Sequence, residues 1–226
     1  MLLRGNAYHA KLLILSINFL EVTTMDFSKL PSTAYFKALN RSNFMDHGIK
    51  ALWDGCPLLS GPAFTVQLAA GDNLMFHSAI YEAPKGSVIV ADAVDCEFAI
   101  AGGNVCAVAQ KRGIAGFIID GVIRDLGEIR EARFPVFARG VVPVPGKKNF
   151  ISPLNKPIRC GGAHVSGGDY IVADEDGVVV IPSDKAQEYY KIAHETEEKE
   201  QNTTLDEWEM AHRKKIANLL ISKKLE

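Results

Sequence analysis

The sequence lacks several features that would place it in a familiar class of protein. Its four cysteines are spread out without a CxxC pair, which favours reduced, buried thiols in an intracellular protein. No GxGxxG follows the first predicted strand, so the pattern is not that of a simple dinucleotide-binding fold. The formal charge of −2 and the lack of a dense basic stripe give no reason to expect a nucleic-acid partner. The sequence also shows no internal repeat and no low-complexity linker.

The first 24 residues stand apart from the rest. Arg4 and Lys11 flank the apolar run LLILSINFL, which is similar to the core of a signal peptide. The run is too short to cross a bilayer, and no small-x-small cleavage pattern follows it. We therefore predict that residues 1–24 are an extension, which either packs as a helix or reflects the assigned start codon. Residues 25–226 are expected to form one domain of a cytoplasmic protein that does not bind a membrane.

In the middle of the chain, apolar strands alternate with short helices. Asp72 is placed to cap the first of these helices, and Gly113 to end the second in a left-handed conformation. This alternation indicates a layered α/β fold. The predicted strands cover 62–71, 87–93, 115–120 and 134–140, and the predicted helices cover 73–81, 104–112 and 126–132.

The two ends of the domain read differently. Residues 26–39 predict a helix that begins or breaks near Pro31. The second half is richer in strands, at 158–165 and in a hairpin around an Asp176-Gly177 turn. A calcium loop at this turn is not expected, because the remaining ligand positions are missing. A long helix from residue 183 or 184 and a second helix over 205–220 form a helical tail.

The segment GGNVCAVAQKRGIAGFIIDGVIRDLGE, residues 102–128, carries the main chemical signal. Arg124 offers a planar fork for a carboxylate or phosphate, and Asp125 offers oxygen ligands for a divalent cation. One helix and one strand separate Gly103 from Arg124, which is enough to bring the two turns side by side. The alternative is that Arg124 and Asp125 form a solvated turn that caps the next helix.

The paired glycines at the start of this segment suit a ligand. Gly102 and Gly103 would let the backbone approach an anion closely, and the helix that follows would present free N–H groups. The amides of Asn104 and Val105 are therefore candidate substrate contacts. The glycines alternatively serve only to pack strand against helix.

Two stretches together, GGNVCAVAQKRGIAGFIIDGVIRDLGEIREARFPVFARG and GGDYIVADEDGVVVIP, resemble the proteins related to the regulator of ribonuclease E activity. This superfamily includes metal-dependent 4-hydroxy-4-methyl-2-oxoglutarate aldolases. The resemblance implies a β/β/α fold like that of swivelling phosphohistidine domains, assembled as a homotrimer or a hexamer. It also implies that Asp125 ligates Mg²⁺ or Mn²⁺ and that Arg124 holds the substrate carboxylate. The ribonuclease regulator itself lacks the Asp, so the presence of Asp125 favours the enzyme.

The chain departs from the aldolase pattern at Gly103, where the well-studied members have an acidic residue that helps to hold metal-bound water. The resemblance also implies a carboxylate from the C-terminal region of a neighbouring subunit. Four residues qualify, and the sequence does not choose among them: Glu195, Glu197, Glu198 and Glu200.

The resemblance, together with Arg124 and Asp125, implies a lyase that releases pyruvate from a 4-hydroxy-2-oxo acid, decarboxylates oxaloacetate, or does both. The cation would stabilise the enolate oxygen. A Schiff base is not expected, since Lys111 reads as a solvated lysine near the end of a helix. His77, His164 and His194 receive no role from the sequence. The competing hypothesis is a non-catalytic regulator that binds a protein partner such as a ribonuclease.

Overall fold

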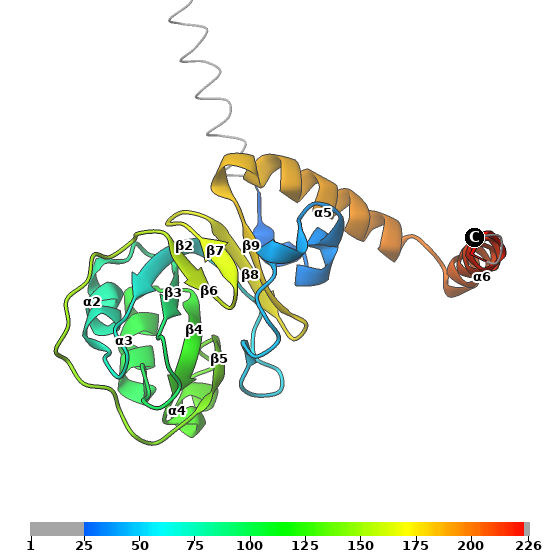
Figure 1. Ribbon diagram of the computed structural model, residues 1–226. Helices are drawn as coiled ribbons and strands as arrows, with labels where there is room; N and C mark the ends of the chain where they lie inside the picture. Colours follow the sequence, from blue (N-terminus) through cyan, green and yellow to red (C-terminus); the bar gives the residue numbers. More distant parts are fainter. Residues whose placement is uncertain (1–24, 224–226) are drawn as a thin grey trace, which may run out of the picture.

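The structure, a computed structural model, describes residues 25–223 (Figure 1). The predictions for residues 1–24 lie outside the described residues. A seven-stranded sheet with the strand order β1-β5-β4-β3-β2-β8-β9 forms the centre of the fold. Within residues 25–223, no helix is both long enough and apolar enough to span a bilayer.

Four parallel strands form the middle of this sheet. They are β2 (Leu59–Gln67), β3 (Val88–Asp92), β4 (Gly116–Ile123) and β5 (Val136–Val141). Strands β3 and β4 are apolar almost throughout, as expected for strands buried on both faces. The short β1 (Lys50–Ala51) pairs antiparallel with β5 at one edge.

The helices that connect the parallel strands lie together on one side of the sheet, as Figure 1 shows. They are α2 (Leu74–Glu82), α3 (Gly103–Arg112) and α4 (Leu126–Glu131). Gly113 ends α3 with a φ of 82°, as predicted. Asp72 accepts a hydrogen bond from the Leu74 N–H at 2.9 Å and so contacts the start of α2, but the cap residue is Asn73, one position later than predicted.

The remaining strands form two hairpins. β8 (Tyr170–Asp174) joins the sheet beside β2 and pairs with β9 (Gly177–Ile181), while β6 (Ile158–Cys160) and β7 (Ala163–Val165) form a separate pair. The predicted hairpin is present, but its turn was predicted one residue too late. The turn residues are Glu175 and Asp176, and Gly177 already pairs with Asp174. The Asp174 carboxylate fixes this register by accepting the Asp176 N–H at 3.1 Å.

The segment before the sheet forms three 3₁₀ helices: η1 (Phe27–Lys29), η2 (Ser32–Lys37) and η3 (Arg41–Asn43). The predicted break at Pro31 is correct, but the prediction of an ordinary helix over 26–39 is wrong. Ser32 is the first residue of η2. Its N–H and hydroxyl both donate to the Asp174 carboxylate at 2.6 Å, which ties this short segment to β8.

The C-terminal tail begins with η4 (Ser183–Lys185) and continues as α5 (Ala186–Gln201) and α6 (Leu205–Ser222). Helix α5 packs on η2 through a second apolar cluster that includes Phe27, Tyr35 and Ala193. Helix α6 has no buried residue and projects away from the body of the molecule (Figure 1). The layered α/β fold with a helical tail is therefore as predicted from the sequence.

Three of the cysteines, Cys56, Cys106 and Cys160, are buried, and none of the four forms a disulfide. Cys96 is exposed, so the prediction of buried thiols holds for three of the four.

Candidate active site

Sequence-predicted residues and residues from other loops meet at the carboxyl ends of the parallel strands. Asn73 follows β2, Gly102 follows β3, Arg124 follows β4 and Lys148 follows β5, and all four line one cleft of about 80 Å³. In open α/β sheets this edge is the usual place for a ligand, because the connecting loops converge there. The parallel order of the strands therefore builds the cleft from segments that are far apart in the sequence.

The two turns predicted to lie side by side are in direct contact. The Gly103 N–H donates to Asp125 Oδ2 at 3.2 Å, and the Arg124 N–H donates to the Ala101 carbonyl at 2.9 Å. The Arg124 Nε lies 3.4 Å from Asp125 Oδ2. These contacts show why glycine is needed at position 102, since an added Cβ would lie 2.5 Å from Asp125 Oδ2.

Asp125 does not use its side chain to cap α4. The residue occupies the cap position in a left-handed conformation with a φ of 58°, yet its carboxylate makes no cap hydrogen bond. Non-glycine residues adopt this conformation rarely, and it often marks a functional position. The alternative considered from the sequence is therefore half right: the turn is solvated, with the side chains of Arg124 and Asp125 43% and 34% exposed, but the carboxylate bonds the Gly103 N–H and does not cap α4.

The start of α3 presents backbone donors to the same cleft. Asn104 and Val105 line the cleft, and the cap residue Gly102 has no side chain to satisfy their N–H groups. The first N–H groups of a helix lack partners within the helix and together with the helix dipole favour an anion. Both amides predicted as contacts therefore belong to residues that line the cleft, at a helix start that favours an anion.

Three residues to which the sequence analysis gave no role also line the cleft: Asn73, His77 and Lys148. Asn73 is buried, its Nδ2 donates to the Ala99 carbonyl at 3.3 Å, and its Oδ1 accepts from Lys148 Nζ at 3.1 Å. The only sequence signal for Lys148 was its place in a short basic run, and nothing in that run indicated that it faces Arg124. The structure therefore adds a second positively charged side chain to the cleft, beside Arg124.

Two titratable groups near the cleft remain neutral at pH 7. Burial and the charge of Lys148 lower the pKa of His77, and a backbone hydrogen bond with Ile100 opposes this shift only in part. Burial, with the nearby Asp125 charge, raises the pKa of Cys106 to about 12. The positive charge of the cleft therefore comes from Arg124 and Lys148.

Asp125 provides one carboxylate for a cation. Its Oδ1 makes no hydrogen bond within residues 25–223, while Oδ2 is held by Gly103. In the same part of the chain, no three His, Cys, Asp or Glu side chains converge as a metal site. One protein carboxylate with the remaining positions taken by water and substrate is the usual arrangement for Mg²⁺, so this donor set fits a hydrated hard cation rather than zinc.

The residues predicted to complete the site from a neighbouring subunit are not near it within one chain. Glu195, Glu197, Glu198 and Glu200 lie on α5, which packs on η2 away from α2–α4 (Figure 1). Glu197 accepts from Gln201 Nε2 at 2.8 Å, and Glu198 lies 3.6 Å from His194 Nδ1. Lys111 is exposed near the end of α3 and does not line the cleft, in agreement with its predicted solvated role.

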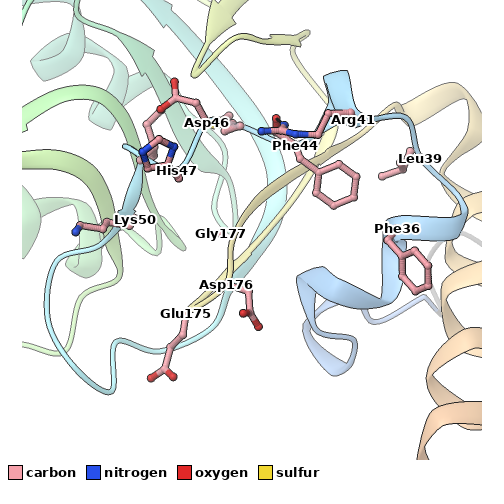
Figure 2. Close-up of a pocket in the computed structure, with 12 residues that line it drawn as sticks. Phe36, Leu39, Arg41, Phe44, Asp46, His47, Lys50, Glu175, Asp176 and Gly177 are labelled. Atoms are coloured by element: carbon pink, nitrogen blue, oxygen red, sulfur yellow. Dashed lines mark hydrogen bonds between the residues drawn. The ribbon is translucent and has the colours of Figure 1, made fainter. Parts of the chain in front are cut away.

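A larger hollow of about 620 Å³ lies between η2, η3 and the β8–β9 turn (Figure 2). Asp46, which lines this hollow, takes part in a structural ion pair. Asp46 accepts hydrogen bonds from both terminal nitrogens of Arg139, at 3.0 and 2.7 Å, and the Arg139 Nε donates to Asp120. These contacts hold the pKa of Asp46 below its usual value. The hollow thus offers volume, whereas the cleft at Arg124 offers the convergent groups that chemistry needs.

Comparison with known proteins places the chain in a family. A "Putative 4-hydroxy-4-methyl-2-oxoglutarate aldolase" from Halalkalibacterium halodurans is 46% identical over 163 residues, 72% of this chain and 76% of that protein. Among solved structures, the fold is similar to RraAS2 of Streptomyces coelicolor, described as an unusual member of the RNase ES inhibitor family, with a TM-score of 0.67, 27% identity, and coverage of 83% of this chain and 94% of that one.

The RNA-processing inhibitor RraA from "Thermus thermophilis" is a further structural neighbour, with a TM-score of 0.57, 26% identity, and coverage of 62% of this chain and 84% of that one. The sequence model described as RraA-like, Aldolase/RraA, matches residues 25–180 and so includes the whole cleft. The chain belongs to the Aldolase/RraA family.

Proposed function

We propose that this protein is a divalent-metal-dependent carbon–carbon lyase that releases pyruvate from a 4-hydroxy-2-oxo acid. The observation that carries the proposal is the placement of Asp125. Its left-handed backbone turns the carboxylate away from α4 and onto the Gly103 N–H at 3.2 Å, beside Arg124 and inside the cleft. The names of the aldolase relatives support the same reaction class.

Mg²⁺ or Mn²⁺ is the proposed cofactor, held by Asp125 through Oδ1. When bound, the cation would supply the positive charge that stabilises an enolate oxygen during bond cleavage. The protein contributes the orientation of the carboxylate, since Gly103 and Arg124 fix its other oxygen. A carboxylate oriented in this way binds a cation without first losing side-chain freedom.

The substrate carboxylate would bind between Arg124 and the start of α3. Arg124 supplies charge-assisted donors, and the N–H groups of Asn104 and Val105 supply neutral ones. Lys148, held by Asn73 at 3.1 Å, adds a further positive charge to the cleft. The neutral His77 adds none. The cleft is therefore suited to small anionic acids.

Oxaloacetate decarboxylation is proposed as a second reaction of the same site. Loss of carbon dioxide from oxaloacetate and aldol cleavage of a 4-hydroxy-2-oxo acid both leave the enolate of pyruvate. Groups that hold the carboxylate and stabilise the enolate therefore serve both reactions. The residues of the cleft give no basis for ranking the two activities.

A homotrimer or hexamer is the proposed assembly, in which a glutamate on α5 of one subunit would approach the cleft of another. The exposure of these glutamates and the length of the C-terminal helices are compatible with such an arrangement. Light scattering of the purified protein would measure the subunit number. A monomer at micromolar concentration would contradict this part of the proposal.

A regulator that binds a protein partner is the second candidate. One observation favours it. The 18-residue helix α6 buries no residue and exposes Trp208 and Met210, as a helix that docks on a partner would. A binding protein has no need for the Asp125 arrangement, so the two candidates differ in what they require of this residue.

The test is a coupled pyruvate-release assay with oxaloacetate and with 4-hydroxy-4-methyl-2-oxoglutarate. It is run with Mg²⁺, with EDTA, and with the variants Asp125→Ala and Arg124→Ala. We expect Asp125→Ala to lose most of the metal-dependent rate and Arg124→Ala chiefly to raise KM. Asp176→Ala, on the exposed β8–β9 turn, is the matched control and should keep wild-type activity.

Full metal-dependent activity in Asp125→Ala would refute the assignment of this residue. Lack of turnover of both substrates by the folded, metal-supplied protein would favour the regulator.

A further inference from the structure

The Glu128 side chain occupies the space in which a side chain at position 103 would lie. A Cβ on Gly103 would overlap Glu128 Oε2 and would lie 2.9 Å from its Cδ and 3.1 Å from its Cβ. Gly103 does not have a positive φ, so its backbone conformation does not require glycine. A side chain at position 103 would therefore displace the Glu128 carboxylate from the place it occupies beside the turn.

Asp125 and Glu128 approach Gly103 from the same short segment. Asp125 Oδ2 accepts the Gly103 N–H, and Glu128, in the first turn of α4, lies against the Gly103 Cα. Two carboxylates thus flank one residue of the turn. Arg124 lies 3.4 Å from Asp125 Oδ2, and a cation at Asp125 would add a second positive charge beside this turn.

Glu128 does not make the capping hydrogen bond that a glutamate at this helix position can make. A glutamate at the third helical position can cap the helix by accepting the N–H of the cap residue, here Asp125. Helix α4 has no side-chain cap hydrogen bond. Within residues 25–223, the Glu128 carboxylate forms no hydrogen bond and no ion pair. A carboxylate in the first turn still favours the helix dipole, so Glu128 stabilises α4 without a hydrogen bond, and its exposed oxygens keep their acceptor positions open to water.

We propose that Glu128 is the second carboxylate of the cation site and accepts hydrogen bonds from the water that hydrates a cation held by Asp125. The inference rests on the proposed function, since it presupposes a cation at Asp125. Mg²⁺ and Mn²⁺ keep several waters when one carboxylate binds them, and these waters need oriented acceptors. Glu128 is a positioning residue in this account, because it acts on the cation through water.

Mn²⁺ binding to metal-free protein, measured by titration calorimetry or by the loss of the free-ion electron paramagnetic resonance signal, tests this proposal without any substrate. Loss of a carboxylate that orients the waters of a metal typically weakens affinity about 10- to 100-fold. We expect a Mn²⁺ Kd at least about 10-fold higher for Glu128→Gln. Glu131→Gln, an exposed residue of the same helix, should bind Mn²⁺ as the wild type does.

A pair of double variants tests the position of the carboxylate rather than its mere presence. In G103D/E128A the carboxylate would enter the same space from α3 in place of α4, whereas G103A/E128A leaves that space without a charge. We expect G103D/E128A to bind Mn²⁺ more tightly than G103A/E128A. Equal affinities of the two double variants would overturn the proposal.

Asp125→Ala separates failure of this inference from failure of the proposed function. If Asp125→Ala abolishes Mn²⁺ binding while Glu128→Gln binds as the wild type does, Glu128 has no role and the proposed cation site stands. If Asp125→Ala binds Mn²⁺ with wild-type affinity, the cation site itself is wrong and the role of Glu128 falls with it. Circular dichroism of each variant confirms that the fold is retained.

Discussion

Substitution of Gly102 by alanine perturbs the candidate site with little expected effect on the rest of the fold. The added Cβ would lie 2.5 Å from Asp125 Oδ2 and 3.0 Å from both Cγ and Nε of Arg124. Ordinary contact distances are about 3.5 Å, so the carboxylate must move by roughly 1 Å. Gly102 has a φ of −145° and a ψ of −174°, which alanine adopts without strain.

The structure therefore predicts a large effect on function and a small effect on stability. A displacement of 1 Å in an active site can lower the rate on the order of 100-fold. A displaced metal carboxylate lowers cation affinity by about 10-fold or more. The free energy of unfolding should fall by no more than about 1 kcal/mol, because only a cap glycine is replaced.

The assays for Gly102→Ala are pyruvate release, Mn²⁺ titration and urea unfolding, each run beside Gly127→Ala. Gly127 is exposed on α4, and a Cβ there meets no atom within 4 Å. This control should keep wild-type activity and gain about 0.5–1 kcal/mol of stability, because glycine is unfavourable within a helix. If Gly102→Ala retains wild-type turnover and Mn²⁺ affinity, the Asp125 geometry is not what the reaction depends on.

Three further predictions concern stability. Burial lowers the pKa of His77 in the folded protein below the ordinary histidine value of about 6.5, so the unfolded chain binds more protons in acid and the free energy of unfolding falls as the pH drops below about 6.5. His77→Gln should therefore flatten the fall in Tm between about pH 7.5 and 5, and an unchanged slope would contradict this. Arg139→Ala removes the charged partner of Asp46 and Asp120, each of which keeps only a backbone N–H donor, and should cost about 2–3 kcal/mol in urea unfolding. A cost below about 0.5 kcal/mol would show that the network is dispensable. Thr204→Ala removes the capping box of α6 and should weaken this helix by about 1 kcal/mol, seen as faster hydrogen exchange over 205–212 with an unchanged global Tm; a lower global Tm would instead mean that α6 is coupled to the core.

Local structure was largely predictable because it depends on neighbouring residues. The apolar strands and the left-handed Gly113 follow from short-range chemistry and were found as predicted. Asp72 does bond the start of α2, although the cap residue is its neighbour Asn73. The error at residues 26–39 has a tertiary cause. Ser32 is tied to Asp174, which lies 142 residues further along the chain, and no local pattern reveals such a contact.

The sequence by itself determined the family resemblance, the alternation of strands and helices, and the contact between the Gly102–Gly103 turn and Arg124–Asp125, because one helix and one strand join these turns. Only the tertiary structure decided which other loops reach the cleft. Lys148 meets Asn73 because β2 and β5 are held in one sheet by β3 and β4. Such contacts depend on strand order and register, which are set by packing over the whole sheet rather than by residues near the site.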